Sequence, residues 1–574
     1  MLKKLLVSLL SALLCISVVA EPESQSNGNQ NETDVKIDEK GNVFVPPLKY
    51  HITSDSTAEV IKDGSYIKLE SVVIPSEIRV GGHIYSVTSI GNAAFEKCRS
   101  LTSIEIPSSV TSIGESAFSY GKVLINVAPD NPIYSSVDGI LYDKNKTELI
   151  SASGWKEDVK IPSSVTSIGD YAFKDCDGLT SIKIPSSVTS IGNHAFSWCS
   201  GLTNLKIPSG VTNIGDWAFS HCRGLTNIEI PSSVRSIGKG AFGGCDGLTS
   251  IKIPSSVTSI GDHAFCGCGG LTNIEIPSSV TSIGDHAFYG CSGLTNIKIP
   301  SGVTSIGVEA FDDCEKLASI EIPSSVTNIG DGAFSGCLGL INVALDNPVY
   351  SSVDGILYDK NKTELIYVPK GKKGKIKIPS SVTSIGDYAF WGCSGLTSIN
   401  IPSSVTSIES LAFYECSGLT HIEIPSSVTS IGYGAFSECS GLKSINVATN
   451  NSIYTSENGV LYDKKKTKLI CVPGAKKGKF EIPSSVTSIE SLAFSGCSGL
   501  SRVKIPSNVT SIGDYAFKDC SGLTEIYIPS SVTHIEDWAF QNCKNLDVII
   551  DNSKENVKVG SDAFMGCKSV KFLK

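Results

Sequence analysis

The amino-acid sequence predicts a repeat solenoid, in which short parallel strands follow a right-handed coil around one continuous core. Of its 20 Phe residues, 17 stand in an Ala-Phe dipeptide. These dipeptides are 23 residues apart at most steps, including every step from Phe173 to Phe334. Such a strict period is typical of solenoids, because one short unit cannot bury its apolar side chains until neighbouring units stack on it. With 574 residues, 41% of them hydrophobic, the chain is long enough to build this core.

The N-terminal 45 residues precede the repeats and form two segments. Residues 1–20 are expected to be a secretory signal peptide, with a lysine-containing start, an apolar run and a small-residue cleavage site at Ala20. A lipoprotein signal at Cys15 is a weaker alternative, because a leucine precedes it where a small residue is usual. Residues 21–45 are polar and are expected to be a disordered lead-in to an ordered part that starts near Pro46.

Residues 184–206 form a typical repeat unit, with apolar side chains at fixed positions. The preceding residues 179–184 read L-x-x-I-x-I, an alternation that predicts a short strand with one buried face. Pro185 ends this strand, because proline cannot donate a hydrogen bond to a ladder. Residues 188–191 predict a second short extended piece. Residues 195–199 follow a glycine turn and predict a short helical or 3-10 turn.

Three units carry insertions, which lengthen the step between successive Ala-Phe dipeptides from 23 to 55, 56 and 58 residues. The insertions cover approximately residues 125–161, 341–378 and 445–482. One ten-residue motif recurs in all of them, as YSSVDGILYD in the first two and as YTSENGVLYD in the third. A lysine-rich turn and a T-x-L-I segment follow, so each insertion predicts a hairpin added to the stack.

The L-x-x-I-x-I-P core, the S-I-G-x-x-A-F-x-x-C segment and the 23-residue period resemble BspA-like leucine-rich repeat proteins of bacterial and protozoan cell surfaces. The resemblance covers about residues 48–574. It implies a leucine-rich-repeat-like solenoid over residues 91–574 that is mostly β and irregular. Residues 46–90 are similar to the family's N-terminal capping unit. Residues 549–574 form a degenerate last unit, which is consistent with a C-terminal cap.

Sixteen of the 19 Cys stand three residues after the phenylalanine of an Ala-Phe dipeptide. Side chains in register on parallel coils point the same way, so we expect a column of buried free thiols and no disulfide framework. Cys266 and Cys268 form a C-x-C pair, and Cys471 lies outside the register. No second pair with zinc-ligand spacing accompanies them, so neither a metal nor any other cofactor is predicted.

Charge and motifs exclude several classes of function. The formal net charge is −9, whereas sequence-independent binding to nucleic acid requires a basic face. No apolar run of membrane-spanning length follows the signal peptide, so we expect no transmembrane segment in the mature chain. A nucleophile elbow, zinc-protease motif, P-loop and dinucleotide fingerprint are all missing from the sequence. We therefore expect a protein that is not an enzyme and has no catalytic residues.

Three features of the predicted surface are candidate binding elements. The first is the polar position of the L-x-x-I-x-I strand, where lysine and glutamate alternate from Lys206 to Glu321; a self-compensating solvated ladder explains it equally well. The second is a cluster of aromatic residues, at positions that could also be simply variable: Trp155, Tyr171, His194, Trp198, Trp217 and His221. The third is lysine in two insertions, where a solvated turn is the alternative: Lys370, Lys372, Lys373, Lys476, Lys477 and Lys479.

The export signal, the long repeat body and the lack of catalytic motifs together predict a secreted or cell-surface binding protein. The resemblance to BspA-like proteins implies adhesion, through contacts with extracellular or host-surface proteins, cells or matrix. A glycan-binding surface module is the first alternative, favoured by the tryptophan cluster and by the lysine-rich insertions, which suit sulfated glycans. The second alternative is a structural spacer of the cell envelope that associates with itself.

Overall fold

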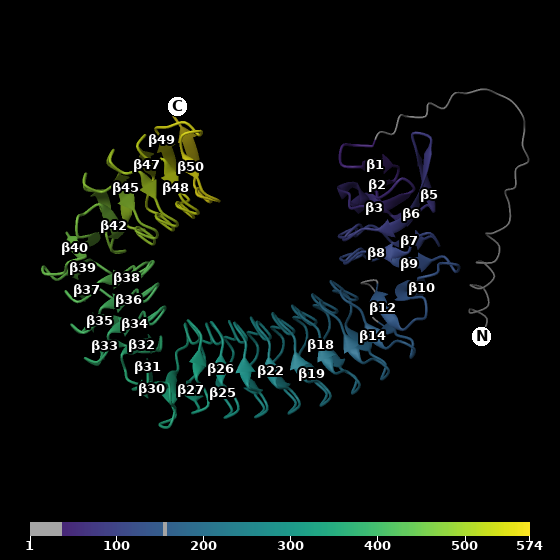
Figure 1. Cartoon of the computed structure of the whole chain (residues 1–574), viewed down its shortest axis with the longest axis horizontal. Coiled ribbons are helices and arrows are strands. Elements are labelled where there is room, and N and C mark those ends of the chain that lie inside the picture. The colour runs from purple at the N-terminus through teal and green to yellow at the C-terminus, as the bar shows by residue number, and fades with distance from the viewer. Residues whose placement is uncertain (1–36, 153–157) are drawn as a thin grey trace, which may run out of the picture.

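The chain forms one β-solenoid that bends into an arch, with the N-terminal and C-terminal units at its two tips (Figure 1). This computed structural model describes residues 37–152 and 158–574. The predicted signal peptide and residues 21–36 of the predicted lead-in lie outside the described residues. Strand β1 already begins at Asn42, within the segment expected to be disordered, because Val43 is buried in the core of the first unit.

The N-terminal capping unit consists mainly of antiparallel pairs and starts the stack. The Tyr66 hydroxyl accepts a hydrogen bond from the Lys49 N–H and donates one to the Ile61 carbonyl, and its ring stacks on Phe95 with centroids 5.3 Å apart. Tyr66 therefore takes the place of a preceding phenylalanine. The elements of this unit are β1 (Asn42–Val45), β2 (Leu48–Ile52), β3 (Thr57–Val60), η1 (Gly64–Lys68), β4 (Ser71–Val73), β5 (Glu77–Val80) and β6 (His83–Ile90).

The L-x-x-I-x-I segments form the long strands of the solenoid, as predicted. They pair in parallel with the next unit, so that Ile251 lies opposite Ile274, 23 residues later. The long strands after β4 are β7 (Ser103–Ile106), β9 (Leu124–Val127), β13 (Asp158–Lys160), β15 (Ser181–Lys183), β17 (Asn204–Lys206), β19 (Asn227–Glu229), β21 (Ser250–Lys252), β23 (Asn273–Glu275), β25 (Asn296–Lys298), β27 (Ser319–Ile322), β29 (Leu340–Val343), β33 (Gly374–Lys377), β35 (Leu396–Asn400), β37 (His421–Ile424), β39 (Ser444–Val447), β43 (Gly478–Glu481), β45 (Leu500–Lys504), β47 (Glu525–Ile528), β49 (Asp547–Ile550) and β51 (Ser569–Phe572).

The second extended piece of each unit forms a two-residue strand, which pairs in parallel with its counterparts in the neighbouring units. These short strands are β8 (Ser112–Ile113), β14 (Ser167–Ile168), β16 (Ser190–Ile191), β18 (Asn213–Ile214), β20 (Ser236–Ile237), β22 (Ser259–Ile260), β24 (Ser282–Ile283), β26 (Ser305–Ile306), β28 (Asn328–Ile329), β34 (Ser384–Ile385), β36 (Ser407–Ile408), β38 (Ser430–Ile431), β44 (Ser488–Ile489), β46 (Ser511–Ile512), β48 (His534–Ile535) and β50 (Lys558–Val559).

The core consists of columns of identical side chains, since each position recurs in every turn. Phe265, Phe288 and Phe311 are fully buried, and their rings stack nearly parallel with centroids 5.4 and 5.3 Å apart. Burial of one such side chain contributes about 1.5–3 kcal/mol. Every cysteine of the described residues is a free thiol, as predicted, and those of the Ala-Phe register are buried except Cys567.

The Ala-Phe segment differs from the helical or 3-10 turn that the sequence predicts. Two turns follow each other here, with hydrogen bonds from Tyr289 N to His286 O and from Cys291 N to Phe288 O. His286 has a φ of 53°, which interrupts any helix. The N–H groups of His286 and Phe288 donate to carbonyls of the next unit, so hydrogen bonds run along the stack and not along a helix. Among the described residues, η1 is the only helix.

Each insertion is a three-stranded antiparallel meander, one strand more than the predicted hairpin. The third strand, from the T-x-L-I segment, also pairs in parallel with a short strand and so returns the chain to the stack. The strands are β10 (Tyr134–Val137), β11 (Ile140–Asp143) and β12 (Glu148–Ser151); β30 (Tyr350–Val353), β31 (Ile356–Asp359) and β32 (Glu364–Tyr367); and β40 (Tyr454–Glu457), β41 (Val460–Asp463) and β42 (Lys468–Cys471).

The insertions also divide the core, because their middle strands are buried on both faces. Leu357 packs into the core segment before the second insertion, while Ile356 and Tyr358 pack into the segment after it. Alternate residues of a strand point to opposite faces, which accounts for this division. The four core segments of the solenoid therefore meet at the three insertions.

Candidate functional site

One row of half-buried rings follows the stack over several turns. It consists of Tyr171, His194, Trp217, His263 and His286, and we call it the aromatic row. Neighbouring ring centroids are 5.0, 6.3, 5.9 and 4.6 Å apart, and all pairs are stacked. All five residues occupy the same position of the 23-residue unit, directly before the Ala-Phe dipeptide. The row therefore results from side chains that recur in register along the solenoid.

The backbone of the aromatic row is left-handed. His194 has a φ of 53° and Trp217 a φ of 56°, a region that bulky residues rarely adopt. Gly240 takes this position in the unit between Trp217 and His263. A Cβ atom on Gly240 would lie 2.2 Å from Cε3 of Trp217, so the indole extends over this glycine to reach His263.

A second aromatic contact lies four residues further along each turn. The rings of Trp198 and His221 stack with centroids 4.0 Å apart, and the Arg223 guanidinium lies 5.6 Å from the Trp198 ring centroid. Trp198 is 38% exposed, whereas every residue of the aromatic row is half-buried. This pair offers an aromatic face with a cation beside it.

Burial keeps several imidazoles of these aromatic contacts neutral. It lowers the pKa of His194 and of His221 from the usual value, and nearby Lys174 and Arg223 add to the respective effects. The pKa of His263 is lowered by burial and then by His286. At neutral pH these rings therefore present uncharged aromatic surface.

The structure brings together five of the six predicted aromatic residues, in two groups and not in one cluster. Tyr171, His194 and Trp217 belong to the aromatic row, whereas Trp198 and His221 form the separate pair. Trp155 lies outside the described residues. The prediction missed His263 and His286 as part of the row, although their shared position in the repeat was the signal that could have revealed it.

The polar position of the long strands forms an exposed ladder of alternating charge. Glu275 lies opposite Lys252 on one side and Lys298 on the other, and Lys206 lies opposite Glu229. Opposite charges on neighbouring strands compensate each other, so the alternating part of the ladder, from Lys206 to Glu321, offers a partner no net charge. One pair breaks the alternation, since Lys160 lies opposite Lys183.

The predicted lysines lie at two separate places. Three are in the turn between β32 and β33, whereas Lys476 and Lys477 are in the turn between β42 and β43, and Lys479 is already in strand β43. Two of them have partners: the Lys370 ammonium lies 3.9 Å from Glu315 Oε1, and Lys476 Nζ donates to the Asn458 carbonyl at 2.6 Å. Lys372 is half-buried. The exposed ones are Lys373, Lys477 and Lys479. Each turn therefore presents only part of its positive charge to solvent.

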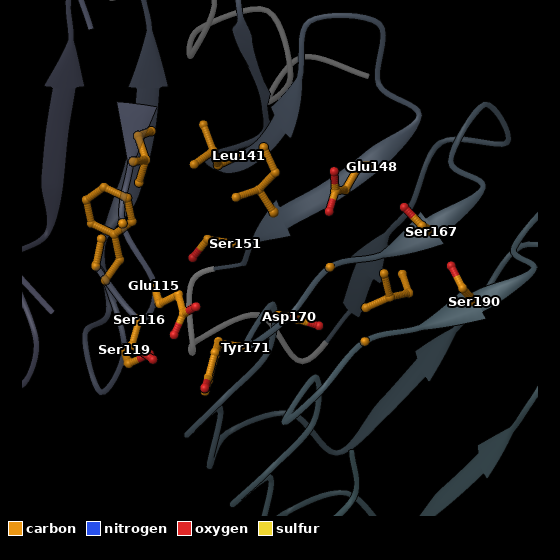
Figure 2. Close-up of a pocket in the computed structure, with 18 residues that line it drawn as sticks. Glu115, Ser116, Ser119, Leu141, Glu148, Ser151, Ser167, Asp170, Tyr171 and Ser190 are labelled. Carbon is orange, nitrogen blue, oxygen red and sulfur yellow. The ribbon is translucent and has the colours of Figure 1, made fainter. Parts of the chain in front are cut away.

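A cleft lies at each insertion, where the meander rejoins the stack. The first cleft has a volume of about 410 Å3, and Glu115, Glu148, Asp170 and Tyr171 line it from different turns (Figure 2). The second and third clefts, of about 310 and 410 Å3, are lined by residues at the equivalent positions. These clefts were not predicted. The ten-residue sequence that recurs in all three insertions could have indicated three equivalent sites.

The clefts form because the meander returns to the stack with a shortened turn. At the second insertion, Leu365 lies opposite Ile385 and the Val368 N–H donates to the Ala389 carbonyl, so these residues are in register. Two residues separate Leu365 from Val368, whereas four separate Ile385 from Phe390. The missing residues leave space between the turns before and after the insertion.

Carboxylates line the first and second clefts at equivalent positions, and the third cleft differs from both. In the second cleft, burial and the neighbouring carboxylates of Asp359, Glu409, Asp331 and Asp387 raise the pKa of Glu364. Among the described residues, neither Glu364, Asp331 nor Asp387 has an ion-pair partner. The second cleft is thus acidic and uncompensated.

The third cleft has a lysine at the position of Glu364. The Lys468 ammonium lies 3.5 Å from Glu490 Oε2, and Ser491 replaces Asp387. The third cleft therefore has the same backbone arrangement as the second, but its lysine is paired with a glutamate.

The described residues contain no group of histidine, cysteine, aspartate and glutamate side chains arranged to hold a metal ion. Within the same residues, no helix has both the length and the apolar character needed to cross a membrane.

Comparisons with known proteins agree with the repeat architecture. The family model described as BspA type leucine-rich repeat region (6 copies) matches residues 65–154, 152–272, 258–373, 368–478 and 471–574. A leucine-rich repeat protein from Eubacterium ventriosum has 29% identity and a TM-score of 0.42, with 64% of this chain and 88% of that chain covered. One from Bacteroides ovatus has 26% identity and a TM-score of 0.34, with 92% and 99% covered.

A leucine-rich cell surface protein from Faecalibacterium prausnitzii has 25% identity to this chain and a TM-score of 0.31, with 90% of this chain and 97% of that chain covered. A search of curated proteins gave no match.

Proposed function

The chain belongs to the BspA-type leucine-rich repeat family, and on this premise we propose that it is an exported cell-surface protein that binds other proteins in adhesion. The proposed partners are proteins of the extracellular matrix, of host surfaces or of neighbouring cells. The solenoid would present its surface to them without any catalytic step.

The aromatic row is the observation that carries this proposal. Its residues hold a left-handed backbone, which costs of order 1 kcal/mol or more for a side chain other than glycine. Glycine fills the same position at Gly240, Gly332 and Gly434, each with a positive φ, so the turn itself needs no ring here. Glu309 and Leu411 also occupy this position with a positive φ, so the turn accepts side chains without a ring. The recurrence of rings in neighbouring units is therefore consistent with a role in binding.

The chemistry of the row suits a protein surface. Half-buried tyrosine and tryptophan rings are enriched at the centres of protein interfaces, where they bury a large area with little loss of conformational freedom. The rings of Tyr171 and Trp217 are held in place by their stacked neighbours. A partner would bury a preorganised surface, which lowers the entropic cost of association.

Binding of purified residues 21–574 to immobilised extracellular-matrix proteins, at low and at physiological salt, tests this proposal. Trp217→Ala is expected to weaken saturable binding about tenfold or more, as for an interface hot spot. Trp538→Ala is the matched control, because Trp538 has the same position in its unit and stacks on Tyr515, far from the aromatic row. Equal binding by both variants and the parent would contradict the role of the row.

Sulfated glycans are the second candidate ligand, favoured by the exposed Lys373, Lys477 and Lys479. Binding to them would rest on charge and would fall steeply with salt, whereas the aromatic row predicts salt-resistant binding. Glycan binding that disappears in Lys477→Ala/Lys479→Ala and persists in Trp217→Ala would favour this candidate. A chain that binds neither class would favour the structural spacer.

A further inference from the structure

Backbone hydrogen bonds connect each Ala-Phe turn to the next one along the stack. The Glu309 N–H donates to the Asp331 carbonyl at 3.0 Å, and the Phe311 N–H donates to the Ala333 carbonyl at 2.8 Å. The same two bonds recur with a 22-residue offset in other turns of the regular stack, as from Phe265 to Ala287. The side of each turn that faces the next unit is therefore a short row of donors two residues apart.

This connection stops at the second insertion. The N–H groups of Gly332 and Phe334, at the positions of Glu309 and Phe311, have no acceptor among the described residues. The shortened turn of the meander, which lacks two residues, accounts for the loss. Gly332 and Phe334 both line the second cleft, so the unpaired donors border the space that the missing residues would fill.

A buried hydroxyl in the same cleft also lacks a partner. Ser335 is 0% exposed and lines the second cleft, and its Oγ makes no hydrogen bond. In a regular turn the equivalent Ser197 Oγ lies 2.8 Å from Ser220 Oγ of the next unit. A buried polar group without a partner is unfavourable, so a ligand that supplies one gains binding free energy.

From this geometry we propose that the second cleft binds an extended peptide segment of another protein that carries a lysine or arginine side chain. Peptide carbonyls two residues apart would accept hydrogen bonds from the N–H groups of Gly332 and Phe334, as in strand addition to a sheet edge. The cationic side chain would lie among Asp331, Glu364 and Asp387, which line the cleft without an ion-pair partner. This site is separate from the aromatic row and does not depend on its function.

Peptide chemistry is favoured because the cleft combines two requirements. The donors of Gly332 and Phe334 are two residues apart in sequence, and an extended chain likewise presents the carbonyls of one side at every second residue. The uncompensated carboxylates select a cation, and one of them, Asp387, is half-buried. A small cation alone would leave the donors of Gly332 and Phe334 unpaired.

The third cleft is a natural control within the same chain. Its N–H groups of Gly434 and Phe436 also lack acceptors among the described residues, so the backbone feature is retained. The Ser437 hydroxyl, however, donates to the Leu492 carbonyl at 3.3 Å, and Lys468 pairs with Glu490. We therefore expect the third cleft to bind a basic peptide more weakly.

Fluorescence anisotropy of purified residues 21–574 with a labelled peptide of alternating valine and lysine tests the proposal. Glu364→Lys, which introduces the residue of the third cleft, is expected to weaken binding at least tenfold. Glu423→Lys makes the same change of charge on exposed β37 and is expected to leave binding unchanged. Equal weakening in both variants, or no binding at millimolar peptide, would overturn the proposal.

Hydrogen exchange measured with and without this peptide tests the backbone contacts. We expect slower exchange in residues 330–336 and unchanged exchange in residues 432–438 of the third cleft. Unchanged exchange in both segments would overturn strand-like docking, even if the peptide binds elsewhere. Trp217→Ala should retain peptide binding, so failure of the aromatic-row proposal and failure of this one give different results.

Discussion

The Sγ atom of Cys291 lies 3.2 Å from the carbonyl oxygen of Phe265 and donates a hydrogen bond to it. Phe265 belongs to the preceding turn, 26 residues earlier. The same contact recurs from Cys199 to Phe173 at 3.1 Å, and along most of the column. The cysteines are therefore both small apolar core residues and donors that connect successive turns.

Native alkylation is expected to distinguish Cys266 from Cys268. Burial raises the pKa of Cys268 to about 12, and its side chain is 0% exposed, so almost no reactive thiolate is present at pH 8. Cys266 lies outside the column and is partly exposed. Mass spectrometry after brief iodoacetamide treatment should find Cys266 modified first, and treatment in denaturant should modify both equally. Equal rates in the native protein would contradict the buried column.

Phe288→Ala should destabilise the middle of the stack. Phe288 is fully buried between Phe265 and Phe311, and loss of a buried phenylalanine typically costs about 3–5 kcal/mol. Phe44→Ala is the control, because Phe44 is 48% exposed. Urea unfolding should show a lower midpoint for Phe288→Ala, together with new protease cleavage near the substitution. Equal midpoints for both variants would contradict the stacked core.

Glu275→Lys should lower thermal stability in a salt-dependent way. It would place three lysines on adjacent strands, opposite Lys252 and Lys298, at an expected cost of about 0.2–1 kcal/mol per like-charged pair. Glu275→Gln removes the attraction without adding repulsion and should have a smaller effect. Thermal unfolding at low and high salt should show that the difference between the variants shrinks as salt increases. A difference that does not depend on salt would exclude this electrostatic cause.

Asp312→Asn should stabilise the protein at pH 8 and have little effect near pH 4. Burial, and then Asp313 and Glu309, raise the pKa of Asp312 from 3.8 to about 7. The folded state therefore holds this proton more tightly than the unfolded state does. The resulting stability is complete below pH 3.8 and is lost as the pH rises through about 7. Unfolding midpoints of parent and variant across this range should diverge with pH, and a constant difference would contradict the shift.

Much of the architecture could be predicted because it depends on short sequence patterns that recur in every repeat unit. The 23-residue period, the strand that ends at Pro185 and the thiol register depend on residues close in sequence, and the structure confirms the strands and the free thiols. No helix forms at the Ala-Phe segment, where a helical or 3-10 turn was predicted, because the residue before Ala-Phe has a left-handed backbone, with a φ of 53° at His286. Only the stacked structure reveals that the N–H groups of His286 and Phe288 donate to carbonyls of the next unit.

The candidate sites were predictable only in part. The shared position of Tyr171, His194 and Trp217 was visible in the sequence, and their stacking follows from the register. The contact from Trp217 to His263 across Gly240 could not be predicted. It depends on the Trp217 side chain extending over Gly240, which has no Cβ atom.

The sequence by itself determined the repeat class, the register of the side chains and the positions of the insertions, since each is a property of local spacing. Tertiary structure alone decided which hydrogen-bond donors remain unpaired. The N–H groups of Gly332 and Phe334 lose their acceptors because a turn beginning at Leu365, more than 30 residues later, is two residues too short to cover them. These unpaired N–H groups result from the way two turns stack on each other, so they cannot be predicted from the sequence of a single repeat unit.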